Sequence, residues 1–242
     1  MTIKHTIGKF IFPFIPIHRR VFNMVRSELN AFGIRLKYVL YPSYVMRLLR
    51  LRTMKHISLN VGCGGRCFAG WVNTDIRPLK SKEFFMQLDI RRKLPFQDRS
   101  VKRIFAEHVI EHIDFTYDIP KTLAEFYRVL EHGGTLRISV PDTQRFLQAY
   151  VYNDLSRWRE LGWNVDRLQE HIYTQMHVLN LVFQQSGDHL FAYDFETLSV
   201  VLKKAGFKTV LRSQYNGSAD DQLRVDCDVH KLYSLYVEAL KE

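Results

Sequence analysis

Glycine and acidic residues follow three short apolar runs of the sequence, in the order expected for a nucleotide-binding site. The run Ile57–Val61 leads into Gly62–Gly65, a stretch rich in glycine that permits a tight turn and a close approach to a ligand. Asp75 ends the second run and Asp89 ends the third. In dinucleotide-binding folds, a carboxylate after the second strand accepts hydrogen bonds from ribose hydroxyls. We therefore expect Asp75 to hold a ribose, with Asp89 within reach of an adenine ring.

The three cysteines do not form a pattern for metal binding or for disulfides. Cys63 and Cys67 lie four residues apart, but no second pair and no nearby histidine completes a metal site. An odd number of cysteines, with Cys227 as the third, indicates a reducing compartment. No bound metal is expected from these residues.

The elements that must position the acidic residues alternate between strand and helix patterns. Apolar residues at helical spacing follow Pro120, and the pair Gly133–Gly134 is expected to stop that helix. A later helix is expected to start at a cap, Asp194, and to end at Gly206. This alternation predicts a mostly parallel sheet with right-handed crossovers and helices on both faces. The expected strands are Ile57–Val61, Trp71–Thr74, Phe84–Leu88, Val101–Ala106, Leu136–Val140, Lys208–Leu211 and Leu235–Leu240.

Residues 143–193 interrupt this alternation with a helical segment rich in aromatic residues and histidines. The segment follows the fifth expected strand, so it should lie at the carboxyl edge of the sheet, where ligands bind in open α/β folds. We interpret it as a cap over the substrate. The alternative is that its aromatic residues only pack its helices onto the core.

Four further stretches complete a recognisable series. The order and spacing resemble the small methyltransferases of the type 11 kind that use S-adenosylmethionine (SAM), and the branch associated with surface-polysaccharide biosynthesis in particular. The resemblance covers about residues 56–142 and 190–240, and it implies a class I, Rossmann-like sheet of seven strands whose last strand is antiparallel. The stretches are Leu94–Val101 (LPFQDRSV), Ala106–His112 (AEHVIEH), Phe126–Gly134 (FYRVLEHGG) and Leu136–Asp142 (LRISVPD).

The resemblance also implies a role for each candidate residue at the cofactor. The glycine loop would hold the methionine part of SAM, Asp75 the ribose and Asp89 the adenine. Asn60 stands where an acid is common, and its side chain can still accept a hydrogen bond from the amino group of SAM. The full set of cofactor-binding candidates is Asn60, Gly62, Cys63, Gly64, Asp75, Asp89 and Glu107.

We predict methyl transfer from SAM to an oxygen, with a sugar or glycan hydroxyl as the first choice of acceptor. A neutral hydroxyl benefits from a general base. His108 is the first candidate because it directly follows the fourth strand, where the active site of such enzymes opens. His189 and Asp142 are the further catalytic candidates, together with Glu107.

The net charge of +10 is confined to one end of the chain. Residues 1–55 contain eleven Lys or Arg and one acid, Glu28, whereas the remaining 24 bases are balanced by 24 acids. We predict that residues 1–55 form a basic amphipathic arm and residues 56–242 the methyltransferase domain. Such an asymmetry suggests an anionic partner, either a membrane surface or nucleic acid.

No apolar run reaches the ~20 residues that a membrane span requires, because Pro13 and Pro16 interrupt the longest one, Phe10–Ile17. No secretory leader is recognised either. We expect a cytoplasmic protein that contacts the inner face of the membrane peripherally.

Three alternatives remain open. A nucleic-acid methyltransferase would use the arm to bind phosphates, but the N/D-P-P-Y/F motif of base methylation is absent. A SAM-binding protein of this fold without turnover is the second alternative. An NAD enzyme is disfavoured, because Cys67 replaces the third glycine of its loop and Asp75 follows too soon.

Overall fold

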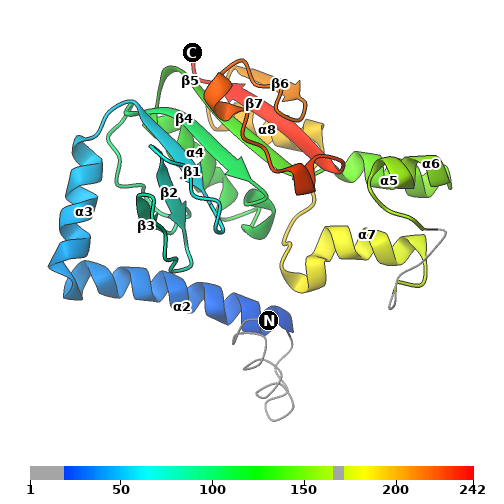
Figure 1. The fold of residues 1–242 in the computed structure, drawn as a ribbon, viewed down its shortest axis with the longest axis horizontal. Helices are drawn as coiled ribbons and strands as arrows, with labels where there is room; N and C mark the ends of the chain where they lie inside the picture. The colour runs from blue at the N-terminus through cyan, green and yellow to red at the C-terminus, as the bar shows by residue number, and fades with distance from the viewer. Residues whose placement is uncertain (1–18, 166–171) are drawn as a thin grey trace, which may run out of the picture.

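The computed structural model describes residues 19–165 and 172–242, and seven strands in these ranges form one sheet (Figure 1). Its order is β3-β2-β1-β4-β5-β7-β6, and β7 runs antiparallel to both of its neighbours. The other neighbouring pairs are parallel. The Rossmann-like sheet with an antiparallel last strand is therefore confirmed. The strands are β1 (Ile57–Val61), β2 (Val72–Asp75), β3 (Phe85–Gln87), β4 (Val101–Glu107), β5 (Leu130–Pro141), β6 (Thr209–Ser213) and β7 (Ser234–Leu240).

Seven α-helices and four single turns of 3-10 helix accompany the sheet within the described ranges. Helices α3, α4 and α8 contribute to the larger hydrophobic core. A smaller cluster around Trp71, Phe105 and Leu223 includes residues of the segment that carries η3 and η4. The helices are α2 (Arg19–Leu40), α3 (Pro42–Thr53), α4 (Ile119–Val129), α5 (Thr143–Val151), α6 (Leu155–Glu160), α7 (Gln175–Gln184) and α8 (Phe195–Lys204); the turns are η1 (Ile110–His112), η2 (Gln185–Gly187), η3 (Asp221–Leu223) and η4 (Asp228–His230).

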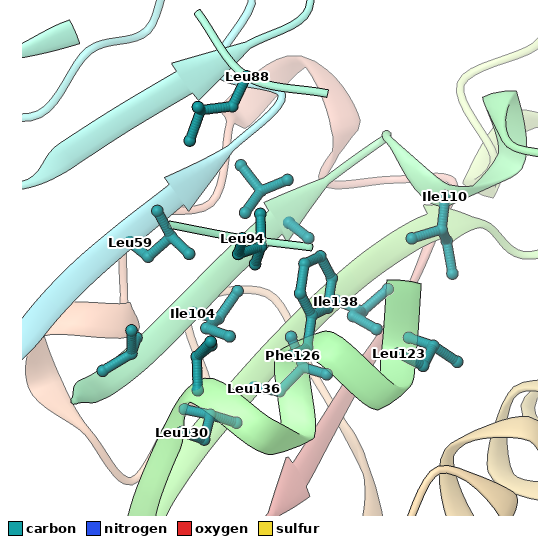
Figure 2. Packing of buried hydrophobic residues seen from close by; sticks show 14 of the residues in the cluster. Leu59, Leu88, Leu94, Ile104, Ile110, Leu123, Phe126, Leu130, Leu136 and Ile138 are labelled. Carbon is teal, nitrogen blue, oxygen red and sulfur yellow. The ribbon is translucent and has the colours of Figure 1, made fainter. Parts of the chain in front are cut away.

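The central strands of the sheet pack their alternate side chains against α4. Ile104 of β4 and Ile138 of β5 lie beside Phe126 of α4, and all three are at most 1% exposed (Figure 2). Alternation places every second residue of a strand on the same face, and the apolar stripe of α4 covers that face. Burial of each such side chain contributes about 1.5–3 kcal/mol. This packing fixes β4 and β5 against α4.

The expectation that Gly133–Gly134 ends a helix is wrong. Helix α4 ends at Val129, and β5 begins at the next residue and includes both glycines. Lys241 Nζ donates hydrogen bonds to the main-chain oxygens of Tyr127 and Leu130. These carbonyl groups at the end of the helix therefore have hydrogen-bond donors without a glycine cap. A Cβ at Gly134 would lie 3.0 Å from Lys102 O, so glycine permits the close approach of β5 to β4.

Helices α2 and α3 are the described part of the predicted basic arm. Tyr44, Leu48 and Leu51 of α3 are buried in the larger core, whereas α2 lies along the rim of the molecule (Figure 1). The apolar run Phe10–Ile17 lies outside the described residues. Within the described ranges, no helix is both long enough and apolar enough to cross a membrane.

The inserted segment forms helices α5, α6 and α7, which follow the carboxyl end of β5. They have a hydrophobic cluster of their own, with Phe146, Trp158 and Val178 fully buried. Residues 166–171 of the segment lie outside the described residues. The role of these helices as a substrate cap, and the division of the chain at residues 55 and 56, stay predictions.

Candidate active site

Two adjoining cavities open at the carboxyl ends of the parallel strands. The larger has a volume of about 500 Å³ and the smaller about 310 Å³, and both are lined by Gly62, Arg77 and His108. Ligand sites commonly have volumes of about 300–1,000 Å³. The site therefore has two compartments that meet at the glycine loop and at His108.

The glycine loop after β1 is shaped by its neighbours. Gly62 has a φ of +61°, and a Cβ added there would lie 2.4 Å from Cγ2 of Val109. Gly64 also has a positive φ, and its N–H donates to Asp75 Oδ2 at 2.9 Å. Cys63 N donates to Thr74 O. The loop is thus tied to the end of β2, and its role in ligand binding stays a prediction.

Asp75 lies at the end of β2 on the wall of the larger cavity and is only 5% exposed. Besides Gly64, it accepts hydrogen bonds from the main-chain N and from Nε and Nη2 of Arg77. Parallel strands bring Asp75 and the glycine loop to the same edge of the sheet. The acceptor positions of the carboxylate are therefore already occupied by donors of the protein.

Asp89 follows β3 and lines the same cavity. It accepts hydrogen bonds from Nε and Nη2 of Arg91 at 2.9 and 3.0 Å, and Arg91 also contacts Glu28 of α2 at 2.5 Å. Each acid is thus paired with an arginine two residues later in the sequence. The repeated spacing is visible in the sequence, although Arg77 and Arg91 were not among the predicted site residues.

Asn60 and Glu107 line the smaller cavity. The side-chain amide of Asn60 donates to Arg66 O and to Asn73 Oδ1, which leaves its own oxygen as an acceptor. Glu107 is paired with Arg66 and accepts from Cys227 N at 2.7 Å. Burial raises the pKa of Glu107, but contacts with His230 and with these donors hold it below its ordinary value. Glu107 therefore carries a negative charge at neutral pH.

His108 stands at the junction of the two cavities in a left-handed conformation, with a φ of +50°. Its Nδ1 lies 3.1 Å from Glu111 Oε1, and its Nε2 lies 2.7 Å from Ser234 Oγ. The ring packs against His230, with centroids 3.9 Å apart. A non-glycine residue with positive φ is uncommon and costs about 1–3 kcal/mol, so the surroundings must hold it there.

Glu111 was not among the predicted site residues, although the structure places its carboxylate next to Nδ1 of His108. Its side chain is 1% exposed. Burial raises its pKa, but the contact with His108 and the nearby His112 outweigh burial, so the pKa lies below its ordinary value. An ionised carboxylate next to Nδ1 favours the tautomer in which Nδ1 carries the proton and Nε2 has the lone pair.

The other two catalytic candidates are not lining residues of either cavity. Asp142 is buried, accepts from Arg145 N as the N-cap of α5, and pairs with Arg212. His189 lies 2.6 Å through Nδ1 from Val182 O, and burial lowers its pKa. Neither residue lines the cavities described above. Their catalytic roles stay predictions.

The residues of the site fit SAM, the cofactor that the resemblance implies. Asp75 supplies a buried carboxylate that could hold the ribose, and the side chain of Arg77, which now bonds to it, is half exposed. No described residue lies within 4 Å of a Cβ position at Gly65, apart from its chain neighbours, so space is open beside the loop. Asn60 and Glu107 supply acceptors for an amino group in the smaller compartment.

Comparisons with known proteins find one family match and several similar solved structures. Residues 59–138 match the family described as "Methyltransferase domain". No curated protein matches the chain. Similar solved structures include a SAM-dependent methyltransferase from Archaeoglobus fulgidus, with 13% identity, a TM-score of 0.49 and coverage of 87% of this chain and 100% of that one. A possible histamine N-methyltransferase from Thermotoga maritima is 18% identical, with a TM-score of 0.45 and coverage of 88% and 96%.

A third similar structure contains SAM. It is phosphoethanolamine N-methyltransferase 2 from Haemonchus contortus, with 12% identity, a TM-score of 0.42 and coverage of 83% of this chain and 52% of that one. Its substrate belongs to that protein and is not transferred to this one. The domain match confirms the sequence-based prediction that this chain carries a methyltransferase domain and is an enzyme that uses SAM.

Proposed function

We propose that the chain transfers a methyl group from SAM to an oxygen of its acceptor, and that the acceptor is a sugar or glycan hydroxyl. The observation that carries the proposal is the placement of His108 between Glu111 and the junction of the two cavities. An oriented imidazole suits a neutral hydroxyl, which must lose a proton during transfer. The choice of a glycan is supported by the resemblance of the sequence to enzymes of surface-polysaccharide biosynthesis.

When bound, SAM supplies a methyl group on a positively charged sulfur, which an oxygen nucleophile displaces. The new C–O bond forms as the C–S bond breaks, and the electron pair of the broken bond stays on sulfur. With Nδ1 facing the ionised Glu111, His108 Nε2 has the lone pair; it now accepts from Ser234 Oγ at 2.7 Å, and the acceptor hydroxyl would replace that contact and give up its proton to Nε2. Positioning of the two reactants contributes about 7–11 kcal/mol in well-oriented reactions. A base adds ~10²–10⁴ in rate.

The test is to incubate the protein with methyl-labelled SAM and fractionated cell extract. Label is expected in glycan or lipid-linked glycan, in a form that resists the acid and base treatments that remove methyl esters. Label in RNA or DNA would reject the glycan in favour of a nucleic-acid methyltransferase. Tight SAM binding with no labelled product in any fraction would support a binding protein without turnover.

Peripheral contact with an anionic membrane through residues 1–55 is a second part of the proposal. On α2, five apolar residues at helical spacing point away from the packed side of the helix and are 43–80% exposed. Basic residues accompany this stripe on α2 and α3. The stripe consists of Val25, Leu29, Phe32, Leu36 and Val39.

An anionic bilayer fits this surface better than a second copy of the chain. Residues 1–55 contain eleven cations and one anion, so two such arms brought face to face would repel each other. An interfacial helix combines an apolar face with cations, each of which contributes about 1 kcal/mol near an anionic surface. The charge of the arm and its apolar stripe therefore both favour an anionic membrane as the binding partner.

Sedimentation with vesicles tests the membrane proposal. The full-length protein should pellet with phosphatidylglycerol vesicles at low salt and remain in solution with phosphatidylcholine. Combined Leu29→Ser, Phe32→Ser and Leu36→Ser changes should reduce binding strongly. The matched control makes the same change at three exposed residues elsewhere, Val151, Val229 and Leu232. Equal vesicle binding by the two triple variants would reject the membrane proposal. A wild-type dimer in solution that is lost only in the α2 variant would also reject it, because the stripe would then be a dimer interface.

A further inference from the structure

One side-chain cluster beside the larger cavity is not used by the cofactor. Glu111 and His112 belong to η1, and His189 follows η2, 77 residues further along the chain. One potential ligand atom from each of the three residues lies within 4.8 Å of the other two. We infer that Glu111, His112 and His189 bind a divalent metal ion of the first transition row.

The carboxylate of Glu111 has unused acceptor capacity. Its side chain is 1% exposed, and neither of its oxygens has a hydrogen-bond donor with good geometry in the described part of the chain. Its close polar neighbours include His108 Nδ1, at 3.1 Å from Oε1, and its own main-chain N–H. An ionised carboxylate accepts about four hydrogen bonds, and a buried one is costly unless it is paired or coordinates a metal. A cation at the other oxygen would satisfy this requirement.

The two histidines are held in the form that binds metals. His112 Nδ1 lies 2.9 Å from Asp188 O, and His189 Nδ1 lies 2.6 Å from Val182 O. A carbonyl oxygen only accepts, so Nδ1 carries a proton in both rings, and in the neutral form of each ring Nε2 has the lone pair. Metal-binding histidines commonly donate their second ring N–H to a carbonyl in this way, which fixes the tautomer and the ring orientation. The rings lie close together, with centroids 4.9 Å apart.

The ligand set determines which ions fit. Two imidazoles and one carboxylate suit Zn²⁺, Mn²⁺, Fe²⁺ or Co²⁺ better than Mg²⁺ or Ca²⁺, which prefer oxygen. Metal–ligand bonds of about 2.0–2.2 Å place neighbouring ligands roughly 3–4 Å apart, so small side-chain movements would close the site. Three protein ligands leave coordination positions open, which is typical of catalytic rather than structural sites.

The location connects the ion to the reaction. His112 and His108 both line the larger cavity, so an ion on Glu111 and His112 would lie at its wall. If the proposed methyl transfer to oxygen is correct, the ion would bind the acceptor hydroxyl and lower its pKa, which makes removal of its proton by His108 easier. The acceptor class would then be a hydroxyl compound with a second oxygen able to bind the ion.

A second cluster within the described ranges, Glu107, Cys227 and His230, has similar spacing but a weaker case. Glu107 already pairs with Arg66 and accepts a hydrogen bond from Cys227 N. Its charge is therefore compensated without a metal. This cluster serves as the internal alternative in the experiment.

The experiment uses full-length protein stripped with a chelator and then titrated calorimetrically with Zn²⁺. One equivalent should bind, and Co²⁺ should give the visible absorption bands of a four- or five-coordinate nitrogen and oxygen site. Loss of even an outer-shell partner of a metal ligand typically costs 10–100-fold in affinity. His112→Gln and His189→Gln should therefore each weaken Zn²⁺ binding at least about tenfold. His132→Gln, an exposed histidine on β5, is the matched control and should change nothing.

Three results would overturn the inference: no saturable binding by the wild type, unchanged affinity in both ligand variants, or loss of binding only in His230→Gln. Thermal midpoints of the variants show whether any loss reflects unfolding. The titration contains neither SAM nor an acceptor. Failure of methyl transfer to glycans therefore leaves the metal result standing, and failure of metal binding leaves the methyl transfer open.

Discussion

Removal of the Asp75 carboxylate should weaken SAM binding by an amount that follows from its present contacts. Asp75 now accepts hydrogen bonds from Gly64 N and from three nitrogens of Arg77. A carboxylate offers about four acceptor positions, so two ribose hydroxyls must replace the side-chain nitrogens of Arg77. Binding of the ribose is therefore an exchange of partners and not a simple gain.

The magnitude can be worked from this exchange. Two hydrogen bonds to a charged acceptor are worth at least about 3 kcal/mol. The pair with Arg77, whose side chain is 51% exposed, is worth at most about 1 kcal/mol. The difference of about 2 kcal/mol corresponds to an affinity about thirtyfold lower for Asp75→Ala. Arg77→Gln removes the competing donor, so SAM should bind up to about fivefold more tightly.

Calorimetric titration with SAM measures both variants, and thermal unfolding shows that each still folds. Asp75→Asn is a useful intermediate, because an amide oxygen still accepts from Gly64 N without the charge, and its loss should be smaller than that of Asp75→Ala. Unchanged SAM affinity in a folded Asp75→Ala protein would remove Asp75 from the cofactor site. Equal, large losses in Asp75→Ala and Arg77→Gln would instead show that Arg77 itself binds SAM.

Two further predictions concern the base and the core. His108→Gln keeps a polar side chain without basicity, so single-turnover methyl transfer should slow by ~10²–10⁴ while SAM affinity stays nearly constant; near-normal turnover would reject the base role. Arg137 is fully buried and pairs with Asp226 and Glu238, so Arg137→Met leaves two buried carboxylates without their cation and should lower the free energy of unfolding by about 3–5 kcal/mol. Urea denaturation checks it, and a loss below about 1 kcal/mol would contradict it.

The sequence by itself determined the sheet and the residues at its carboxyl edge. The predicted strand Ile57–Val61 coincides with β1, because its three apolar residues supply the hydrophobic side chains that a strand buried between parallel neighbours favours. Asp194 caps α8, as expected from its side chain and from the apolar stripe that follows. Once the strands are parallel, their ends meet at one edge, so the glycine loop and Asp75 come together without further information.

The misplaced end of α4 shows the limit of local signals. Gly133–Gly134 looks like a helix stop, but in the fold these glycines allow β5 to approach Lys102 of β4. The sequence shows only that the backbone needs freedom at this point. Which neighbouring strand comes close enough to exclude a side chain there depends on strand pairing.

Only the tertiary structure decided which polar side chains meet. His108 contacts Ser234, which lies 126 residues later, because β7 returns antiparallel beside β5. Glu111, His112 and His189 converge because the chain turns back to η1 after α7, where Leu190 N donates to Glu111 O. Such contacts carry no periodic pattern in the sequence. They are set by how distant elements pack, and that packing is fixed by the whole core and not by any local segment.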